Sequence, residues 1–382
     1  MAFLPPRGWV RREGTRPFIV KFIPGEALRS AAESEGALPS WGLVLSHLYY
    51  PSNPTPLQAF VRQAKEHIGR EFKSSKMLEE EELTIGGRPG YRMVFTHEGN
   101  LYLKTVVPRT NLECYLLDAS MPQREASELR PVVESSIASF RMVPLSLGPE
   151  ERAAEARTFE ALKSAKVDPG ILGEGWYAVC LMNTKTGSQR SRLSPSPEGY
   201  AIELDVQNDF GEGGKDATTV RGSFSPDGRY QKIETEHTKQ NAKERWTFRA
   251  TAVLDHGQVK SSLDMNGIKE EKTFRVEPGV LFEDVADILR RTLVRGRGKG
   301  MYLFRVLSPY SDEPEPEFME VNDPEPLEVN GTRRNLWIVF SRMGHRKQMT
   351  YYYDTQGGLV RVGGMRDAFS LRQTTKEEAT RP

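Results

Sequence analysis

The sequence has few of the residues on which common enzyme chemistry and metal sites depend. It holds two cysteines, Cys114 and Cys180, and six histidines in 382 residues. Two cysteines exclude a disulfide-built scaffold and a cysteine-rich zinc module, and we expect both thiols to be free and buried. The histidines stand in no recognised catalytic or ligand spacing, and neither a glycine-rich phosphate loop nor the serine elbow of hydrolases is present. The residues therefore predict no catalytic site, no metal and no cofactor.

Long apolar runs and an excess of one charge are missing as well. No run approaches the ~20 apolar residues that cross a bilayer, so we expect no transmembrane segment. The chain has 53 basic and 52 acidic residues, and its net charge of +1 argues against a nucleic-acid partner. Residues 1–9 lack the charged and then apolar stretches of a secretory signal. This predicts a cytoplasmic protein, or a periplasmic one if a leader has been removed.

Aromatic residues and regularly spaced turn signals are what the chain does contain. Its 17 Phe, 13 Tyr and 5 Trp can fill cores although only 37% of the residues are hydrophobic. Runs of alternating residues between Gly-, Asn- and Asp-rich turns predict an α+β fold with antiparallel sheets. We expect a first domain over residues 1–143, a helical linker over 144–170, a larger β-rich domain over 171–373 and a disordered tail over 374–382.

The first domain is expected to be an antiparallel sheet sandwiched by helices. Thr55, Pro56 and Gln58 are typical of a helix start. Apolar residues then recur at helical spacing, at Leu57, Phe60, Val61, Ala64 and Ile68. Residues 81–119 follow as a meander of strands, with a tight turn at Gly86–Gly87, and Pro122 opens a second helix.

Short motifs of this domain resemble the PsbP-like α/β/α family. They are Gly8–Trp9, the early Pro-flanked helix, the step between strands at residues 85–89, and the closing Ser139, Phe140 and Arg141. The resemblance covers the N-terminal third of the chain and implies no shared catalytic residues. Members of that family are mostly non-enzymatic and bind partner proteins, and some bacterial relatives act as chaperones for secreted apolar segments. We therefore expect a protein partner, with a homodimer as one form of it.

The second domain is predicted to be a curved or half-closed antiparallel sheet with one helix packed on it. Residues 281–295 form that helix, with an apolar stripe of Val285, Ile288, Leu289 and Thr292. This arrangement resembles, in topology alone, the unclosed barrel of LolA/LolB-like lipoprotein carriers. The acidic, Pro-containing residues 311–328 are expected to be a mobile loop that could close over basic loops as a lid.

Two groups of residues in this domain are candidates for a ligand site. An apolar groove between sheet and helix could hold an acyl chain or an apolar peptide, lined by Trp176, Trp246, Phe248, Ile288, Phe304 and Trp337. The alternative is that these residues form an ordinary core. Arg295, Arg297 and Lys299 could contact phosphate or a polar head group. Their alternative is a basic helix end capped by Gly296.

These observations favour a non-enzymatic binding protein, an adaptor or chaperone that shelters an apolar segment or acyl chain of a partner. The alternative is a hydrolase or transferase with a site between the two domains, which requires acid–base groups that converge in one cleft. A third hypothesis, nucleic-acid binding through the basic loops, requires affinity that falls as salt is added.

Overall fold

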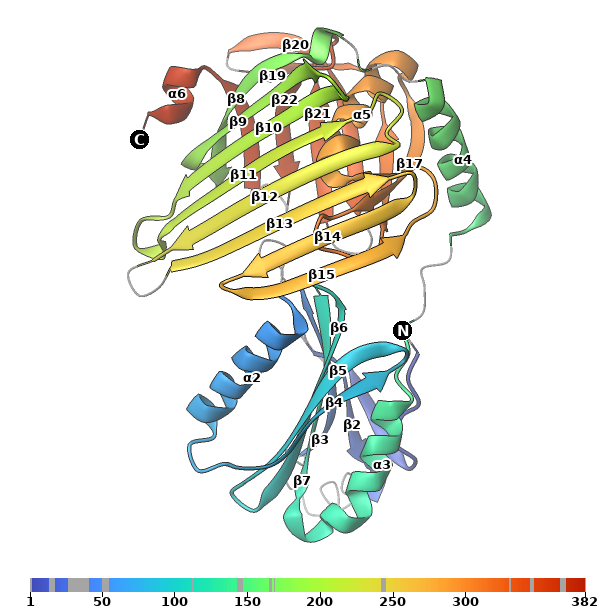
Figure 1. Cartoon of the computed structure of the whole chain (residues 1–382), viewed down its shortest axis with the longest axis vertical. Helices are drawn as coiled ribbons and strands as arrows, with labels where there is room; N and C mark the ends of the chain where they lie inside the picture. The colour runs from blue at the N-terminus through green and yellow to red at the C-terminus, as the bar shows by residue number, and fades with distance from the viewer. Residues whose placement is uncertain are drawn as a thin grey trace. The chain divides into compact units, whose positions relative to one another are not determined.

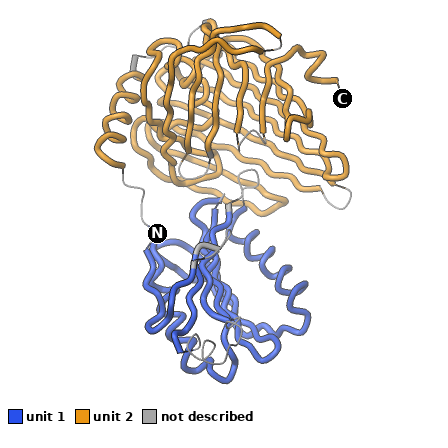
Figure 2. Tube along the Cα trace, turned by 180° about the vertical axis from the view of Figure 1, so that it is seen from behind, with its two compact units in different colours: residues 1–146 blue, residues 147–382 orange. Residues whose placement is uncertain are grey.

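The computed structural model divides the chain into two compact units, Met1–Ser146 and Leu147–Pro382, which we call unit 1 and unit 2 (Figure 2). It describes residues 2–13, 18–26, 41–49, 55–111, 113–142, 147–164, 167, 169–241, 245–329, 331–343, 347–364 and 369–381. The domain boundary predicted at residue 143 falls outside these ranges, three residues from the boundary between the units.

Unit 1 is built on one antiparallel sheet, with seven strands among the described residues. Their order across the sheet is β1-β2-β3-β7-β6-β5-β4. The strands are β1 (Trp9–Glu13), β2 (Phe18–Pro24), β3 (Gly42–Tyr49), β4 (Lys76–Ile85), β5 (Arg88–His97), β6 (Asn100–Thr110) and β7 (Glu113–Pro122). The sequence patterns predict strands at residues 18–23 and 41–50 as well as the four of the meander over residues 81–119. They miss β1, which is short and carries Arg11 and Arg12 in its centre.

Each face of this sheet has its own apolar core and its own helix. Helix α2 (Leu57–Glu71) packs Phe60 and Ile68 against one face, and α3 (Ala126–Ala138) packs Val133 and Ile137 against the other. Successive strand residues such as Met93 and Val94 point to opposite faces, so each strand supplies both cores. Helix α2 begins at Leu57 with Pro56 in the cap position, one residue later than predicted, and its expected apolar face is confirmed.

A tight turn and one aromatic anchor fasten α3 to the sheet. Gly86 and Gly87 join β4 to β5 with φ values of 59° and 82°, a backbone conformation that favours glycine. A Cβ on Gly86 would lie 2.8 Å from the carbonyl oxygen of Phe140, so this chain segment passes directly against the end of α3. Phe140 itself is fully buried. The expected tight turn is confirmed.

Unit 2 is built on a much larger sheet, with 16 strands in the described part of the chain. Its first half contains β8 (Gly173–Leu181), β9 (Thr184–Ser196), β10 (Gly199–Asp209), β11 (Lys215–Phe224), β12 (Tyr230–Gln240), β13 (Arg245–Asp255), β14 (Gln258–Met265) and β15 (Ile268–Arg275). Its second half contains β16 (Val280–Phe282), β17 (Gly300–Leu307), β18 (Glu315–Val321), β19 (Glu325–Val329), β20 (Thr332–Met343), β21 (Lys347–Tyr353), β22 (Leu359–Gly364) and β23 (Phe369–Thr374).

The strands of unit 2 form an unclosed sheet that curves around one helix (Figure 1). The order runs from β15 back to β8, continues through β23, β22, β21, β20, β18 and β17, and ends at β16, with β19 paired to β20. All neighbours are antiparallel except β16 and β17. Helix α5 (Glu283–Arg297) shares one apolar core with both halves of the sheet. We call the face that carries this core the inner face, and the opposite side the outer face.

Two expectations about the ends of unit 2 have different outcomes: the structure has the helix expected in the linker, whereas the disordered tail is wrong. The helix in the linker is α4 (Pro149–Ser164), which belongs to unit 2 and packs on the outer face of β17: Thr158 Oγ1 accepts a hydrogen bond of 2.8 Å from the Leu303 amide. The predicted disordered tail contains α6 (Lys376–Thr380), capped by Thr375 and packed on β8 and β9. In both places polar helices are held by long-range contacts that local composition does not reveal.

The acidic residues 311–328 are also ordered in a way that composition did not predict. They form strands β18 and β19, and the carboxylate of Glu317 points to the inner face. A mobile lid is therefore wrong, although Lys299 and Asp323 do form an ion pair of 2.7 Å between this segment and the basic one. The coarse fold class, α+β with large antiparallel sheets, is confirmed. Among the described residues, we find no helix that combines the length and the apolar character needed to span a bilayer.

Candidate functional site

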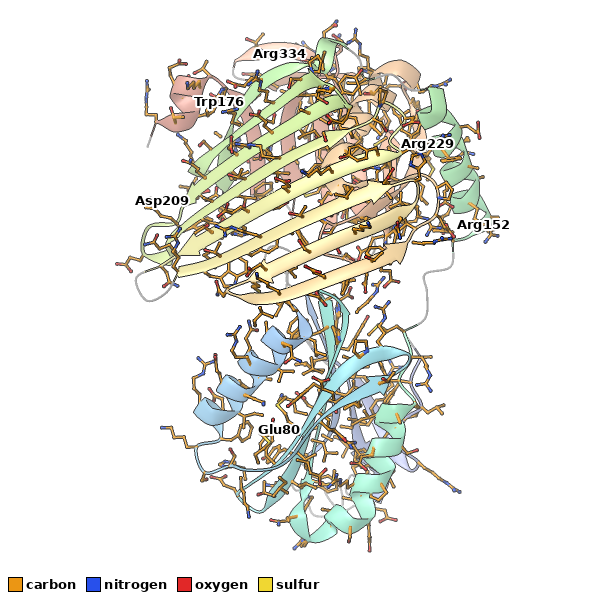
Figure 3. The ribbon with its side chains drawn as sticks, viewed as in Figure 1. Glu80, Arg152, Trp176, Asp209, Arg229 and Arg334 are labelled. Atoms are coloured by element: carbon orange, nitrogen blue, oxygen red, sulfur yellow. The ribbon has the colours of Figure 1, made fainter. Side chains whose placement is uncertain are left out.

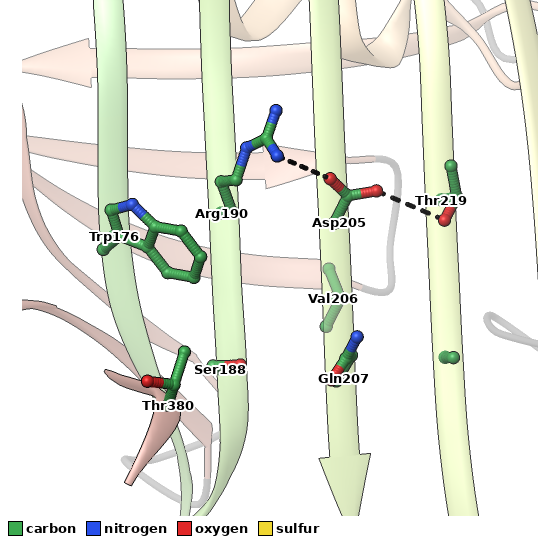
Figure 4. A pocket seen from close by; sticks show the side chains of 9 residues that line it. Trp176, Ser188, Arg190, Asp205, Val206, Gln207, Thr219 and Thr380 are labelled. Atoms are coloured by element: carbon green, nitrogen blue, oxygen red, sulfur yellow. Dashed lines mark hydrogen bonds and ion pairs between the residues drawn. The ribbon is translucent and has the colours of Figure 1, made fainter. Parts of the chain in front are cut away.

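A pocket of about 240 Å³ opens on the outer face of unit 2 (Figure 4). Three neighbouring strands provide its floor, β8 and the helix α6 provide its sides, and Figure 3 places Trp176 next to α6. The residues that line it are Trp176, Ser188, Arg190, Asp205, Val206, Gln207, Ala217, Thr219 and Thr380.

Strand register explains why these side chains meet. Trp176 pairs with Arg190, Arg190 with Asp205, and Asp205 with Thr219, so the four residues form one row across β8, β9, β10 and β11. Two residues further along, Ser188, Gln207 and Ala217 form the next row on the same face. Residues two apart on a strand share a face, and the apolar residues between them supply the inner core.

The C-terminal helix α6 forms one side of the pocket. Lys185 Nζ donates a hydrogen bond of 2.8 Å to the carbonyl oxygen of Glu378, and it donates a second to that of Arg381. An ammonium group is favourable at this end of a helix, where carbonyl groups lack partners within the helix. Lys376 Nζ lies 5.7 Å from the centre of the Trp176 ring, a cation–π contact. These contacts bring Thr380 to the edge of the pocket.

Charged side chains in the pocket are already paired. The Arg190 guanidinium lies 2.6 Å from a carboxylate oxygen of Glu203, 3.3 Å from Glu174 and 3.7 Å from Asp205. Asp205 also accepts hydrogen bonds of 3.0 Å from Arg221 and 3.3 Å from Thr219. Three carboxylates therefore face two guanidinium groups, and the Lys376 ammonium lies over the Trp176 ring. The pocket has no large excess of either charge.

Trp176 is held in one orientation. Its Nε1 donates a hydrogen bond of 2.7 Å to Glu174 Oε1, and Glu174 is in turn an ion-pair partner of Arg190. The ring is half-buried, so part of it remains open to the pocket. A fixed aromatic surface beside hydroxyl, amide and carboxylate groups can orient a small polar ligand without any conformational change.

The six residues predicted to line a groove are not brought together. Ile288 and Phe304 are buried in the inner core, 6% and 1% exposed, and Trp337 packs at its border. Trp246 and Phe248 lie elsewhere on the sheet, their rings 5.8 Å apart. Of the six, Trp176 alone lines the pocket on the outer face.

The predicted head-group residues lie at the end of α5, opposite its acidic start. Helix α5 includes Arg295 and Arg297, and its cap is Gly298 rather than the expected Gly296. Arg295 donates a hydrogen bond of 3.3 Å to the carbonyl oxygen of Gln356, and Lys299 is paired with Asp323. None of the three lines the described pocket.

Sequence analysis missed a network of charges buried inside unit 2. Arg290 of α5 donates to both carboxylate oxygens of Glu317 on β18, each at 2.8 Å, and the two side chains are 3% and 1% exposed. Ser341 donates to the same carboxylate. Arg290 also bonds Asp287 at 2.8 Å, and Arg291 bonds Asp287 at 2.5 Å. The helix is thereby joined to β18 by charge-assisted hydrogen bonds in which one guanidinium nitrogen meets both carboxylate oxygens.

The environment of this network stabilises its charges. Burial disfavours a charged Asp287, but the adjacent Arg291 and Arg290 outweigh that penalty and lower its pKa. Burial also raises the pKa of Tyr353, so its phenol stays neutral. The Tyr353 hydroxyl is buried without a hydrogen-bond partner in the described part of the protein. We regard the network as a structural clamp, because every one of its charges is engaged by another residue of the fold.

The described histidines are dispersed over both units. His47 lies 2.6 Å from the buried Glu113, His237 lies 2.8 Å from Asp216, and His256 lies 2.6 Å from Asp255. His67 is exposed on α2, His97 lies 3.6 Å from Glu98, and His345 is outside the described residues. No histidine lines the pocket. Within the ranges that the structure describes, no group of three or more His, Cys, Asp or Glu residues is arranged to hold a metal ion.

Both cysteines are free and buried, as expected. Burial raises the pKa of the Cys114 thiol to about 12, so it is a poor nucleophile at neutral pH. Cys114 packs in the core beneath α2 and is fully enclosed.

Comparisons with known proteins assign no family. No protein-family model matches the chain, and no curated protein matches it significantly. Among solved structures, a beta-barrel-like protein of a domain of unknown function, DUF1849, from Brucella abortus aligns with 55% of this chain and 97% of its own at 11% identity and a TM-score of 0.42. SurE with D-Leu aligns with 52% of this chain and 38% of its own, at 14% identity and a TM-score of 0.12. Neither likeness is close enough to support an argument about this chain.

Proposed function

We propose that this protein is a non-enzymatic binding protein whose ligand site is the outer-face pocket of unit 2. The supporting observation is the combination of a fixed Trp176 ring with polar groups on three adjacent strands around a preformed hollow. Preformed pockets with a few convergent polar groups are typical of binding sites. The carboxylates in this pocket are engaged by arginines, which leaves no obvious acid or base to move a proton.

Packing favours this site over an apolar groove. Of the residues that would have sheltered an acyl chain, Ile288 and Phe304 are enclosed in the continuous core around α5, and Trp337 packs against that core. A chain could enter there only by displacing buried side chains, which costs about 1–3 kcal/mol or more for overpacking alone. Binding of a partner at the protein surface does not require the core to open, whereas sheltering an acyl chain in an apolar groove does. The LolA/LolB-like resemblance is supported only by the unclosed sheet and its packed helix.

Unit 1 is proposed to contact a protein partner, as its PsbP-like resemblance implies. Support comes from the antiparallel sheet with a helix on each face, from the turn at Gly86 and Gly87, and from the buried Phe140. These features are structural, and they are compatible with an adaptor that presents its surface rather than an internal site.

Filling the pocket tests the proposed site. Ala217 is exposed on its floor, so Ala217→Trp should occupy the hollow without disturbing the core. Thr251→Trp places the same side chain on the outer face of β13, outside the pocket, and serves as the matched control. Thermal shift is measured for the wild type and both variants with N-acetylglucosamine, glucose, glycylglycine, inorganic phosphate and decanoate.

The pocket is supported if any polar probe raises the melting temperature of the wild type and of Thr251→Trp but not that of Ala217→Trp. A shift with decanoate alone that persists in Ala217→Trp would favour the apolar-carrier mode instead. Absence of any shift with all five probes contradicts the proposed site.

A further inference from the structure

The charge balance of the pocket limits the ligands that it can accept. A phosphate or carboxylate ligand drawn to Arg190 or Arg221 would compete with the carboxylates of Glu203 and Asp205, with which these arginines already pair. A cationic ligand drawn to one of those carboxylates would likewise compete with its arginine. Breaking such a pair leaves a partly desolvated charge without its partner, which opposes binding. A neutral ligand can bind without this cost.

The remaining polar groups suit a ligand rich in hydroxyl groups. The side chains of Ser188 and Gln207 line the pocket and form no hydrogen bond with another described residue. Thr219 and Thr380 add hydroxyl oxygens from β11 and α6 that can accept hydrogen bonds, since their own hydrogens are donated to Asp205 and to the Lys376 carbonyl. Hydroxyl and amide groups both donate and accept hydrogen bonds, and so do the hydroxyl groups of a sugar. Ser188, Gln207 and Thr219 stand on adjacent strands, roughly 4.8 Å apart, so one small ring can reach more than one of them.

Trp176 adds an apolar surface against which a sugar ring can pack. The face of a sugar ring carries C–H groups, which are slightly positive, while the face of an indole ring is electron-rich. The ring is fixed by its bond to Glu174 and its contact with Lys376, so little entropy is lost when a ligand packs against it. A hollow of about 240 Å³ accommodates one ring, and its opening on the outer face allows a longer chain to continue into solvent.

We infer that the pocket binds a neutral saccharide unit, held against Trp176 and hydrogen-bonded by Gln207 and Ser188. This inference rests on the proposed function, since it names the ligand class of the same site. The surrounding ion pairs, Arg190 with Glu203 and Asp205 with Arg221, keep the site neutral and position Trp176 through Glu174.

The test is calorimetric titration of the full chain with glucose, galactose, mannose and N-acetylglucosamine. Trp176→Ala and Gln207→Ala should each weaken saccharide binding by about tenfold or more, the effect of losing one good contact. Gln258→Ala removes an exposed glutamine from the outer face of β14, outside the pocket, and should leave binding unchanged. Glycylglycine and inorganic phosphate are titrated in parallel, also against Ala217→Trp.

Binding of at least one of the four sugars, weakened in both pocket variants and kept in Gln258→Ala, supports the inference. Sugar binding that neither pocket variant weakens overturns it. If none of the sugars binds but glycylglycine or phosphate does so in the wild type and not in Ala217→Trp, the saccharide inference fails and the pocket remains a binding site. If no probe binds, both proposals fail.

Discussion

The two faces of the unit 2 sheet carry similar ion pairs in opposite environments. On the inner face, Arg290 and Glu317 are almost fully buried, and their charges are satisfied by each other, by Asp287 and by Ser341. On the outer face, Arg249 and Glu236 meet at 3.0 Å but are 67% and 50% exposed. The comparison teaches that burial, not distance, decides what an ion pair contributes. The inner pair specifies how α5 docks on β18, whereas the outer pair lies on β12 and β13, where water screens its charges.

Removing one partner of the inner pair should have the largest effect. Arg290→Met leaves the carboxylate of Glu317 buried without its cation, and we expect unfolding free energy to fall by about 3–5 kcal/mol. The measurement is urea denaturation followed by tryptophan fluorescence. Arg290→Met combined with Glu317→Leu should recover most of the loss, because an apolar pair of similar volume needs no partner. A loss below about 1 kcal/mol in the single variant would contradict the burial argument.

The second-largest effect is expected when acid weakens the inner network. The pKa of Asp287 is lowered below its ordinary value of 3.8, so its carboxylate contributes stability above that value. That contribution is lost as the pH falls further, through the pKa of the folded state. We expect Asp287→Asn to flatten the decline of unfolding free energy below about pH 4. The unfolding free energy of both proteins is measured by denaturation at a series of pH values. If it declines equally steeply in the two proteins below about pH 4, Asp287 does not have this role.

A pair of tyrosines sharpens the comparison within the inner face. The buried Tyr353 hydroxyl has no partner among the described residues, whereas that of Tyr302 donates a hydrogen bond of 3.0 Å to the Gly298 carbonyl. Tyr353→Phe should therefore stabilise unit 2 by about 1 kcal/mol, and Tyr302→Phe should destabilise it by about 1 kcal/mol. Thermal and urea unfolding of both variants provide the measurement. Equal effects of the same sign would show that the hydroxyl environment does not matter.

The smallest effect is expected on the outer face. Arg249→Met removes an exposed ion pair and should change unfolding free energy by less than about 1 kcal/mol. Added salt should reduce even this difference, because exposed pairs are screened. A double-mutant cycle with Glu236→Gln at low and high salt measures the coupling. Coupling as large as that between Arg290 and Glu317 would break the comparison.

Local patterns predicted much of the secondary structure. The stripe of Val285, Ile288, Leu289 and Thr292 is buried as expected, because helical spacing alone places those residues on one side. The turn at Gly86 and Gly87 was equally readable from composition. Strand β9 was missed, since its segment from Thr184 to Ser196 is polar on both faces and ends in a proline-containing stretch. That omission hid Ser188 and Arg190, and with them the pocket.

Arg290 illustrates why the charged core could not be predicted. In sequence it is one of several basic residues near a helix end, where arginine is favoured by the helix dipole. Glu317 sits in a segment whose acidic character predicted solvent exposure. Glu317, Met319 and Val321 occupy every second position of β18, and all three are buried. This period of two is the signal in the sequence that places Glu317 on the same face as two apolar residues.

Periodicity and turn chemistry were enough to predict two sheet-rich units and the apolar faces of α2 and α5, because each depends on residues close together in the chain. The docking of α6 through Lys185, the Arg290–Glu317 pair and the row from Trp176 to Thr219 depend on strand register and on contacts between distant segments. Which pairings form is decided by the total burial and charge pairing of the whole fold. A short stretch of sequence does not contain that information.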